Sequence, residues 1–173
     1  MVKINREDFA KIEVNGAYLM GIINSMNEEN VQPYREKYNL TDIQPDKWYS
    51  GLKVIDFYDD IENNMGGMFD LVAIGMNIVK HIEFPPEVDN VKAAMMMSKE
   101  MHYGAWRNGH PGTMDVQFPA DQHIRLIYEN LPLPIDLVYG LCYGAVKRFV
   151  ESPSNIRVER QQEGNKYTFD IKW

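Results

Sequence analysis

The chain has 173 residues, enough for one domain with a sizeable core. It carries 25 Asp and Glu against 18 Lys and Arg, and this acidic balance argues against nonspecific binding to nucleic acid or to an anionic membrane surface. Its single cysteine, Cys142, excludes a disulfide within the chain, and neither a signal-peptide pattern nor an apolar run of about 20 residues is present, so we expect a soluble, cytoplasmic protein.

Residues 1–47 are expected to form a helical N-terminal arm. The first fourteen residues alternate weakly between apolar and polar, which favours a short strand or an extended arm. Asn15 is a good N-cap for a helix over Ala17 to Met26. A second helix is predicted from Glu28 to Tyr38, interrupted near Pro33, and turn-forming residues then lead to Lys47.

Three further helices are predicted between Asp46 and Trp106. Asp46 is expected to cap a helix that carries Trp48, Leu52, Ile55 and Tyr58 at steps of three and four. The second helix, Met68 to Ile82, is apolar over most of its circumference and should be largely buried. The third is predicted from Glu87 to about Trp106. Pro85 and Pro86 end the preceding helix and suit the start of this one, because proline is tolerated in the first turn of a helix.

The pattern beyond Gly112 changes from a helical period to a period of two. Alternation in Met114 to Phe118 and again in Ile124 to Tyr128 predicts a first hairpin. Alternation from Ile156 to Trp173 around a QQEGN turn predicts a second one.

The segment between the two hairpins, Leu133 to Val150, has the spacing of one central helix. Gly140 and Gly144 lie one turn apart in it, and a glycine inside a helix costs about 1 kcal/mol relative to alanine. We therefore expect another element to lie very close to this helix.

The order of elements predicts an α+β fold: an N-terminal helical part packed on a four-stranded antiparallel sheet made of two hairpins that flank a central helix. No linker divides the chain, so we expect a single domain over residues 1–173, with residues 1–47 as the arm and residues 48–173 as the core.

The second half of the chain resembles a family of sensor-type domains. The runs VDNVKAAMMMSKEMHYGAWRNGHPG, ENLPLPIDLVYGLCYGAVKRF and NKYTFDIKW are similar to 4-vinyl-reductase domains and haem nitric-oxide/oxygen-binding (H-NOX) domains, whose broad fold also occurs in TRAPP vesicle-tethering subunits. The resemblance covers about residues 48–173. It implies sensing of a small apolar molecule or binding of a partner, often as a dimer.

The chain departs from the pattern of these families at two places. The tyrosine–serine–arginine signature that holds haem propionates in H-NOX domains has no match, and the cysteine cluster of some 4-vinyl-reductase domains is missing. A metal held by cysteines is therefore not expected, and the cofactor stays unknown, with haem as one possibility.

Candidate pocket residues lie mainly on the middle helices. His102 stands on an inner stripe, where its imidazole could bind haem iron, although a buried histidine bonded to a carbonyl is the commoner case. Methionines crowd the same helices and suit either an adaptable apolar pocket or ordinary core packing. Trp106 and Arg107 could hold a ligand carboxylate or simply close the core. The full candidate set is Met68, Val72, Met76, Met95, Ser98, His102, Trp106, Arg107, Tyr139 and Cys142.

Signatures of catalysis are absent from the sequence. No HExxH, phosphate-binding loop or GxSxG motif occurs, so we expect neither catalytic residues nor a zinc site. The acidic run of Asp56, Asp59, Asp60 and Glu62 is expected to be a solvated face.

Together these features predict a non-catalytic small-molecule-binding or sensor domain. Its apolar, Met-rich pocket would lie between helices and sheet and take a small apolar or amphipathic ligand, and we expect a homodimer. One alternative is a TRAPP-like structural or protein-interaction module without a ligand. A weaker alternative is a haem- or tetrapyrrole-binding protein.

Overall fold

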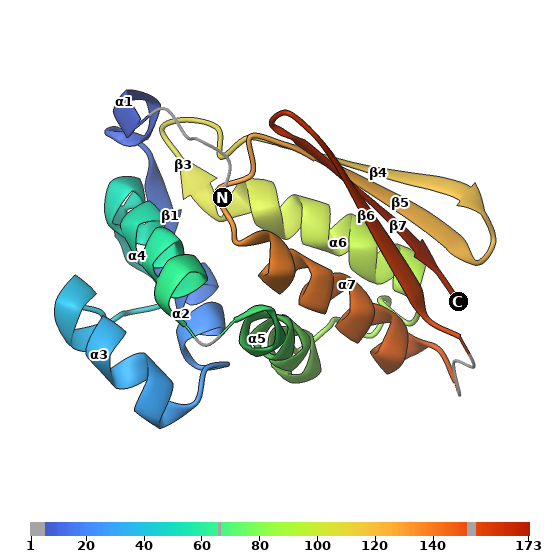
Figure 1. Cartoon of the computed structure of the whole chain (residues 1–173), viewed down its shortest axis with the longest axis horizontal. Helices are drawn as coiled ribbons and strands as arrows, with labels where there is room; N and C mark the ends of the chain where they lie inside the picture. Colours follow the sequence, from blue (N-terminus) through green and yellow to red (C-terminus); the bar gives the residue numbers. More distant parts are fainter. Residues whose placement is uncertain (1–5, 66, 152–154) are drawn as a thin grey trace.

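The computed structural model describes residues 6–65, 67–151 and 155–173, and the side chains of Asp8, Met68 and Phe69 lie outside that description. The elements, in chain order, are α1 (Arg6–Phe9), β1 (Glu13–Asn15), α2 (Gly16–Ile23), α3 (Glu28–Tyr38), β2 (Trp48–Ser50), α4 (Gly51–Asn64), α5 (Met68–His81), α6 (Val91–Gly104), β3 (Trp106–Arg107), β4 (Thr113–Ala120), β5 (His123–Glu129), α7 (Ile135–Phe149), β6 (Arg157–Glu163) and β7 (Lys166–Lys172). Helices come first, followed by hairpin, helix and hairpin, so the predicted α+β class is confirmed (Figure 1).

The larger sheet consists of the two predicted hairpins in the order β4-β5-β7-β6, with antiparallel neighbours throughout. Leu126 lies opposite Phe169, and Ile124 lies opposite Ile171, so these apolar side chains share one face of the sheet and are fully buried. The period of two in the sequence therefore marks the inner face. Helices α6 and α7 run beside each other along the sheet, as Figure 1 shows.

Helix α7 packs tightly against α5, and the glycines predicted to mark a close approach lie at the crossing. A Cβ atom on Gly140 would run into the carbonyl oxygen of Val72 and lie 2.9 Å from its carbonyl carbon. A Cβ atom on Gly75 would lie 2.8 Å from the backbone nitrogen of Leu141. A Cβ atom on Gly144 would lie 3.1 Å from the Cα atom of Met76, so the expectation drawn from Gly140 and Gly144 is confirmed.

A second, smaller sheet was not predicted. Its strands are β2, β1 and β3 in that order, and Glu13 in β1 lies opposite both Ser50 and Arg107. This sheet joins the helices of the N-terminal part, which gather at one end of the molecule in Figure 1, to the end of α6.

Several predicted helix ends are wrong. The helix expected after Asp46 begins only at Gly51, because Trp48–Ser50 pairs with β1 as a strand. The helix expected from Glu87 begins at Val91, because the side chain of Asn90 accepts the backbone N–H of Ala93 at 2.9 Å and so caps the helix there.

Two expectations for the N-terminal part have opposite outcomes. The predicted cap at Asn15 is confirmed, since its side chain accepts the N–H of Ala17 at 2.9 Å. The predicted interruption near Pro33 does not occur, and α3 continues through it to Tyr38.

Within the described ranges, every helix is too short or too polar to cross a bilayer.

Candidate functional site: a neutral apolar cavity around His102

A cavity of about 200 Å³ lies among α2, the end of α5, α6, α7 and the larger sheet. Its walls are built from aliphatic, aromatic and sulfur-bearing side chains, and none of the described residues that line it is Asp, Glu, Lys or Arg. The polar side chains in the wall are Tyr18, Ser98, His102, Tyr128 and Cys142. This composition suits the apolar body of a small molecule with few polar groups.

His102 is the polar group of the cavity that most needs a partner. It lies on α6 with 4 % of its surface exposed, and its Nε2 atom is buried without a hydrogen-bond partner among the described residues. Its ring meets the rings of Tyr103 and Tyr128 edge to face, at centroid distances of 5.5 and 6.2 Å. Buried polar atoms are nearly always paired in folded proteins, so this nitrogen is suited to bind a molecule in the cavity.

The cavity is electrically neutral at pH 7. Burial lowers the pKa of His102 to about 4, so the imidazole is uncharged and can serve as a metal ligand. Burial raises the pKa of the Cys142 thiol to about 12, so this residue is a protonated thiol and not a reactive thiolate. Burial also raises the pKa values of Tyr18 and Tyr128, which keeps both phenols protonated.

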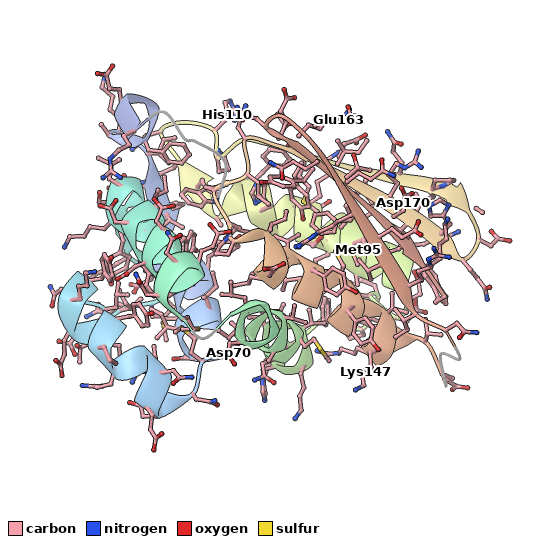
Figure 2. All side chains as sticks on the ribbon, viewed as in Figure 1. Asp70, Met95, His110, Lys147, Glu163 and Asp170 are labelled. Carbon is pink, nitrogen blue, oxygen red and sulfur yellow. The ribbon has the colours of Figure 1, made fainter. Side chains whose placement is uncertain are left out.

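Four of the ten predicted pocket residues line this cavity, namely Met95, Ser98, His102 and Cys142. Met95, a buried residue of α6, lies near α7 in Figure 2. The Ser98 hydroxyl donates to the backbone carbonyl of Met95 at 2.7 Å. Of the methionines on α6, Met95 and Met101 line the cavity, whereas Met96 and Met97 do not.

The other candidates on α5 and α7 lie elsewhere. Val72 and Met76 face the glycines of α7, so they form the contact between the two helices. Tyr139 is half-buried and packs against the core. The side chain of Met68 lies outside the described residues.

Trp106 and Arg107 lie in the smaller sheet and not at the cavity. Trp106 is buried between the rings of Phe9 and Tyr18, each with its centroid 6.3 Å away. The Arg107 guanidinium donates to Glu13 at 2.7 Å and stacks on the ring of Trp48, with its carbon 4.4 Å from the ring centroid. Arg107, which was predicted to bind a ligand carboxylate, is thus already paired with the carboxylate of Glu13.

The wall contributed by α2 was not predicted. Ala17, Tyr18, Gly21 and Ile22 form it, and their helix belongs to the expected N-terminal arm. The sequence contains no local signal that brings this arm against α6, because the contact depends on the pairing of β1 with β3.

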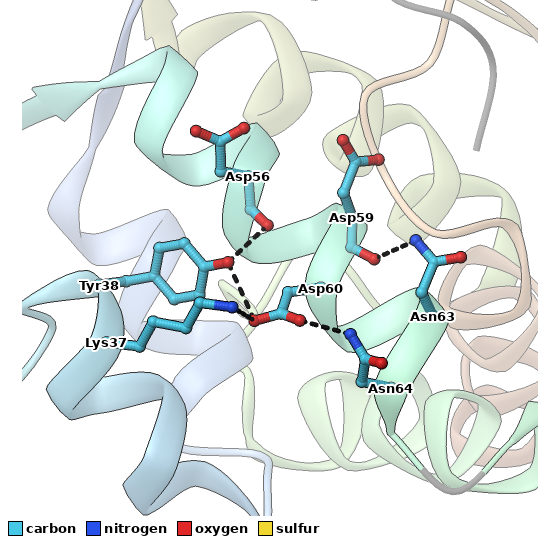
Figure 3. A network of polar contacts seen from close by, with 7 residues as sticks. All are labelled: Lys37, Tyr38, Asp56, Asp59, Asp60, Asn63 and Asn64. Carbon is cyan, nitrogen blue, oxygen red and sulfur yellow. Dashed lines mark hydrogen bonds and ion pairs between the residues drawn. The ribbon is translucent and has the colours of Figure 1, made fainter.

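The acidic stretch of α4 serves to join helices. Asp60 accepts hydrogen bonds from Lys37 at 2.7 Å, Tyr38 at 2.9 Å and Asn64 at 2.6 Å, which ties α3 to α4 (Figure 3). Asp56 binds Arg6 at 2.6 Å.

No set of three His, Cys, Asp or Glu residues among those described is placed to hold a metal ion.

The sequence matches no protein-family model and no curated protein. Solved structures do match it. One, described as showing how haem redox potential is modulated through protein-induced porphyrin distortion, is 18 % identical, with a TM-score of 0.68 over 92 % of this chain and 99 % of that one. An oxygen-binding H-NOX domain related to soluble guanylate cyclases is 17 % identical, with a TM-score of 0.67 over 91 % of this chain and 92 % of that one.

A mutant of the T. Tengcongensis H-NOX protein gives a similar result, with 18 % identity and a TM-score of 0.65 over 91 % of this chain and 96 % of that one. These matches span almost the whole of both chains, although the sequences are far apart. They agree with the arrangement of helices and hairpins described above. By its fold, the chain is therefore an H-NOX-like α+β domain.

Proposed function

We propose that the chain is a sensor domain that holds a haem-type tetrapyrrole, whose iron His102 would bind. The observation that carries this proposal is the buried, unpaired Nε2 atom of a neutral imidazole in the wall of an apolar cavity. A haem iron held by histidine supplies a site for small gaseous ligands or for electron transfer. The match to haem-containing and oxygen-binding structures of the same fold supports the choice.

The residues of the cavity fit this group in chemistry, and the cavity fits it only after widening. His102 offers a neutral nitrogen, and the surrounding side chains suit an apolar macrocycle. The volume of about 200 Å³ lies below the range of roughly 300–1,000 Å³ that is usual for drug-sized ligands. Loading of a tetrapyrrole would therefore require the elements that line the cavity to move apart.

Haemin titration tests the role of His102. We expect the purified chain to bind haemin and give a Soret band, and His102→Ala to shift or lose that band, with recovery when imidazole is added. His81→Ala is the matched control, since His81 is an exposed histidine at the end of α5. If His102→Ala gives the same band and the same affinity as the unchanged chain, His102 does not bind the iron.

The volume of the cavity favours a second candidate function, the binding of a small apolar molecule without iron. A dry cavity of about 150 Å³ is already large enough to hold benzene in another protein. Thermal unfolding with benzene-sized and naphthalene-sized compounds tests this function. A rise in Tm that disappears when Ala145 at the cavity wall is enlarged to Leu supports it, and no rise with any compound excludes it.

An apolar cavity within the fold favours ligand sensing over the alternative of a TRAPP-like interaction module. The large apolar side chains that are most exposed among the described residues, Met96, Met101, Tyr103 and Phe118, are exposed by only 36–42 %.

We further propose that the domain is a homodimer located in the cytoplasm. A native mass measurement at micromolar concentration tests the dimer, and a monomer under those conditions would contradict it.

A further inference from the structure

Arg148, in the last turn of α7, differs from every other arginine in its partners. The other six each pair with a carboxylate; they are Arg6, Arg35, Arg107, Arg125, Arg157 and Arg160. Arg148 has no carboxylate partner among the described residues. Its Nη1 atom donates instead to the backbone carbonyl oxygens of Val79, Lys80 and Ile82 at the end of α5.

The guanidinium of Arg148 lies at the edge of the cavity. Val79, Ile82 and Phe84 line the cavity, and two of them accept hydrogen bonds from Arg148. The guanidinium carbon lies 4.6 Å from the ring centroid of Phe84 and 5.7 Å from that of Phe149. These two rings meet at 78°, with centroids 5.1 Å apart, so they fix the plane of the cation.

Part of the guanidinium remains available for a further acceptor. The hydrogen bonds within the described structure all start from Nη1, and the side chain is exposed to solvent. Nε and Nη2 can therefore donate to an incoming anion, and a carboxylate matches the planar fork of these donors. The apolar cavity next to it contains no charged side chain of its own.

We propose that Arg148 anchors the carboxylate of a ligand whose apolar body occupies the cavity around His102. The proposal rests on the cavity being a ligand site, as argued above, and specifies the class of ligand: a carboxylate attached to an apolar body. Tetrapyrrole propionates and fatty acids both have this chemistry. The wall along α7 runs from Leu137 to Ala145, roughly 12 Å at 1.5 Å per residue, and Arg148 follows it in the last turn of the helix.

A purely structural role for Arg148 makes a different prediction. By binding three carbonyl oxygens, Arg148 also caps the end of α5, where a positive charge is favourable. Loss of a cap would weaken the binding of every ligand to a similar extent. Loss of an anchor weakens only those ligands that carry a carboxylate.

The test compares acids with neutral counterparts. The probes are haemin against haemin dimethyl ester, and decanoate against decanol. The variants are Arg148→Gln and, as a control with the same change in charge, Lys147→Gln, whose exposed side chain lies on the outer side of α7 in Figure 2. We expect Arg148→Gln to lower the affinity for haemin and for decanoate by about 10- to 100-fold. The affinities for haemin dimethyl ester and for decanol should change by less than about twofold.

The outcomes separate the anchor from the tetrapyrrole function. If the unchanged chain prefers decanoate to decanol, loses that preference in Arg148→Gln and does not bind haemin, the tetrapyrrole proposal fails and the anchor stands. If Arg148→Gln weakens all probes equally, or none of them, the anchor is refuted while haem binding stands. Should Arg148→Gln fail to fold, the unchanged chain decides: no preference for acids over their neutral counterparts at low salt overturns the proposal.

Discussion

The substitution Gly140→Ala tests the close packing of α7 on α5. An alanine Cβ would meet the carbonyl oxygen of Val72 and lie 2.9 Å from both the carbonyl carbon and the Cα atom of that residue. These are backbone atoms, so relief requires the helices to separate. Overpacking of this kind costs about 1–3 kcal/mol or more, whereas replacing a helical glycine by alanine gains about 1 kcal/mol. At the upper end of that range, the net loss is about 2 kcal/mol.

Thermal unfolding measures this loss. For a chain of this size, 1 kcal/mol corresponds to a change in Tm of about 2–4 °C, so Gly140→Ala is expected to lower Tm by roughly 4–8 °C. Gly104→Ala is the matched control, because Gly104 ends α6 and a Cβ atom there meets nothing within 4 Å. Its Tm should stay the same or rise. If Gly140→Ala behaves like this control, the two helices do not approach as described.

Three further predictions concern titratable and polar groups. Burial lowers the pKa of His102 from 6.5 to about 4, so between these pH values the unfolded chain binds a proton at this residue that the folded chain does not. The free energy of unfolding should therefore fall by up to about 3 kcal/mol as pH drops from about 6.5 to 4. Urea titrations at the two pH values should show a smaller decrease for His102→Phe. Cys142, with a pKa raised to about 12 by burial, should react with iodoacetamide at pH 8 only after unfolding, and mass spectra showing equal labelling of native and unfolded chains would contradict its placement. Burial raises the pKa of Asp170, but Arg125 and His123 outweigh this effect and lower it, so Asp170→Asn should lose about 1–3 kcal/mol in urea unfolding at pH 7, and an unchanged midpoint would show the network to be unimportant.

The sequence predicts those parts of the fold whose signal is local and repeated. Alternating apolar residues mark β5 and β7, the two central strands of the larger sheet, because their inner face is buried. The glycines of α7 predict a close contact with another element, because a glycine inside a helix is unfavourable unless it allows close packing. The cap at Asn15 follows from its side chain alone.

The smaller sheet and most of the cavity depend on contacts between distant residues. Strands of two and three residues, such as Trp106–Arg107 and Trp48–Ser50, are too short to show any period. Their pairing with β1 explains why a helix predicted from Asp46 begins only at Gly51. It also explains why Arg107 binds Glu13 and why α2 forms a wall of the site. His102 was found because it lies on the inner stripe of α6, whereas nothing in the sequence places Arg148 beside Phe84.

Two of the helices that line the cavity are joined at their ends: the start of α2 meets the end of α6. The backbone N–H of Asn15, which caps α2, donates to the carbonyl of Ala105 at 2.8 Å, and Ala105 directly follows α6. The next residue, Trp106, pairs with Val14 in the smaller sheet. Any molecule that pushes α2 and α6 apart must therefore turn them about this shared joint. Occupancy of the cavity would then change the angle between the two helices, and such a change could be passed to whatever the N-terminal helices contact.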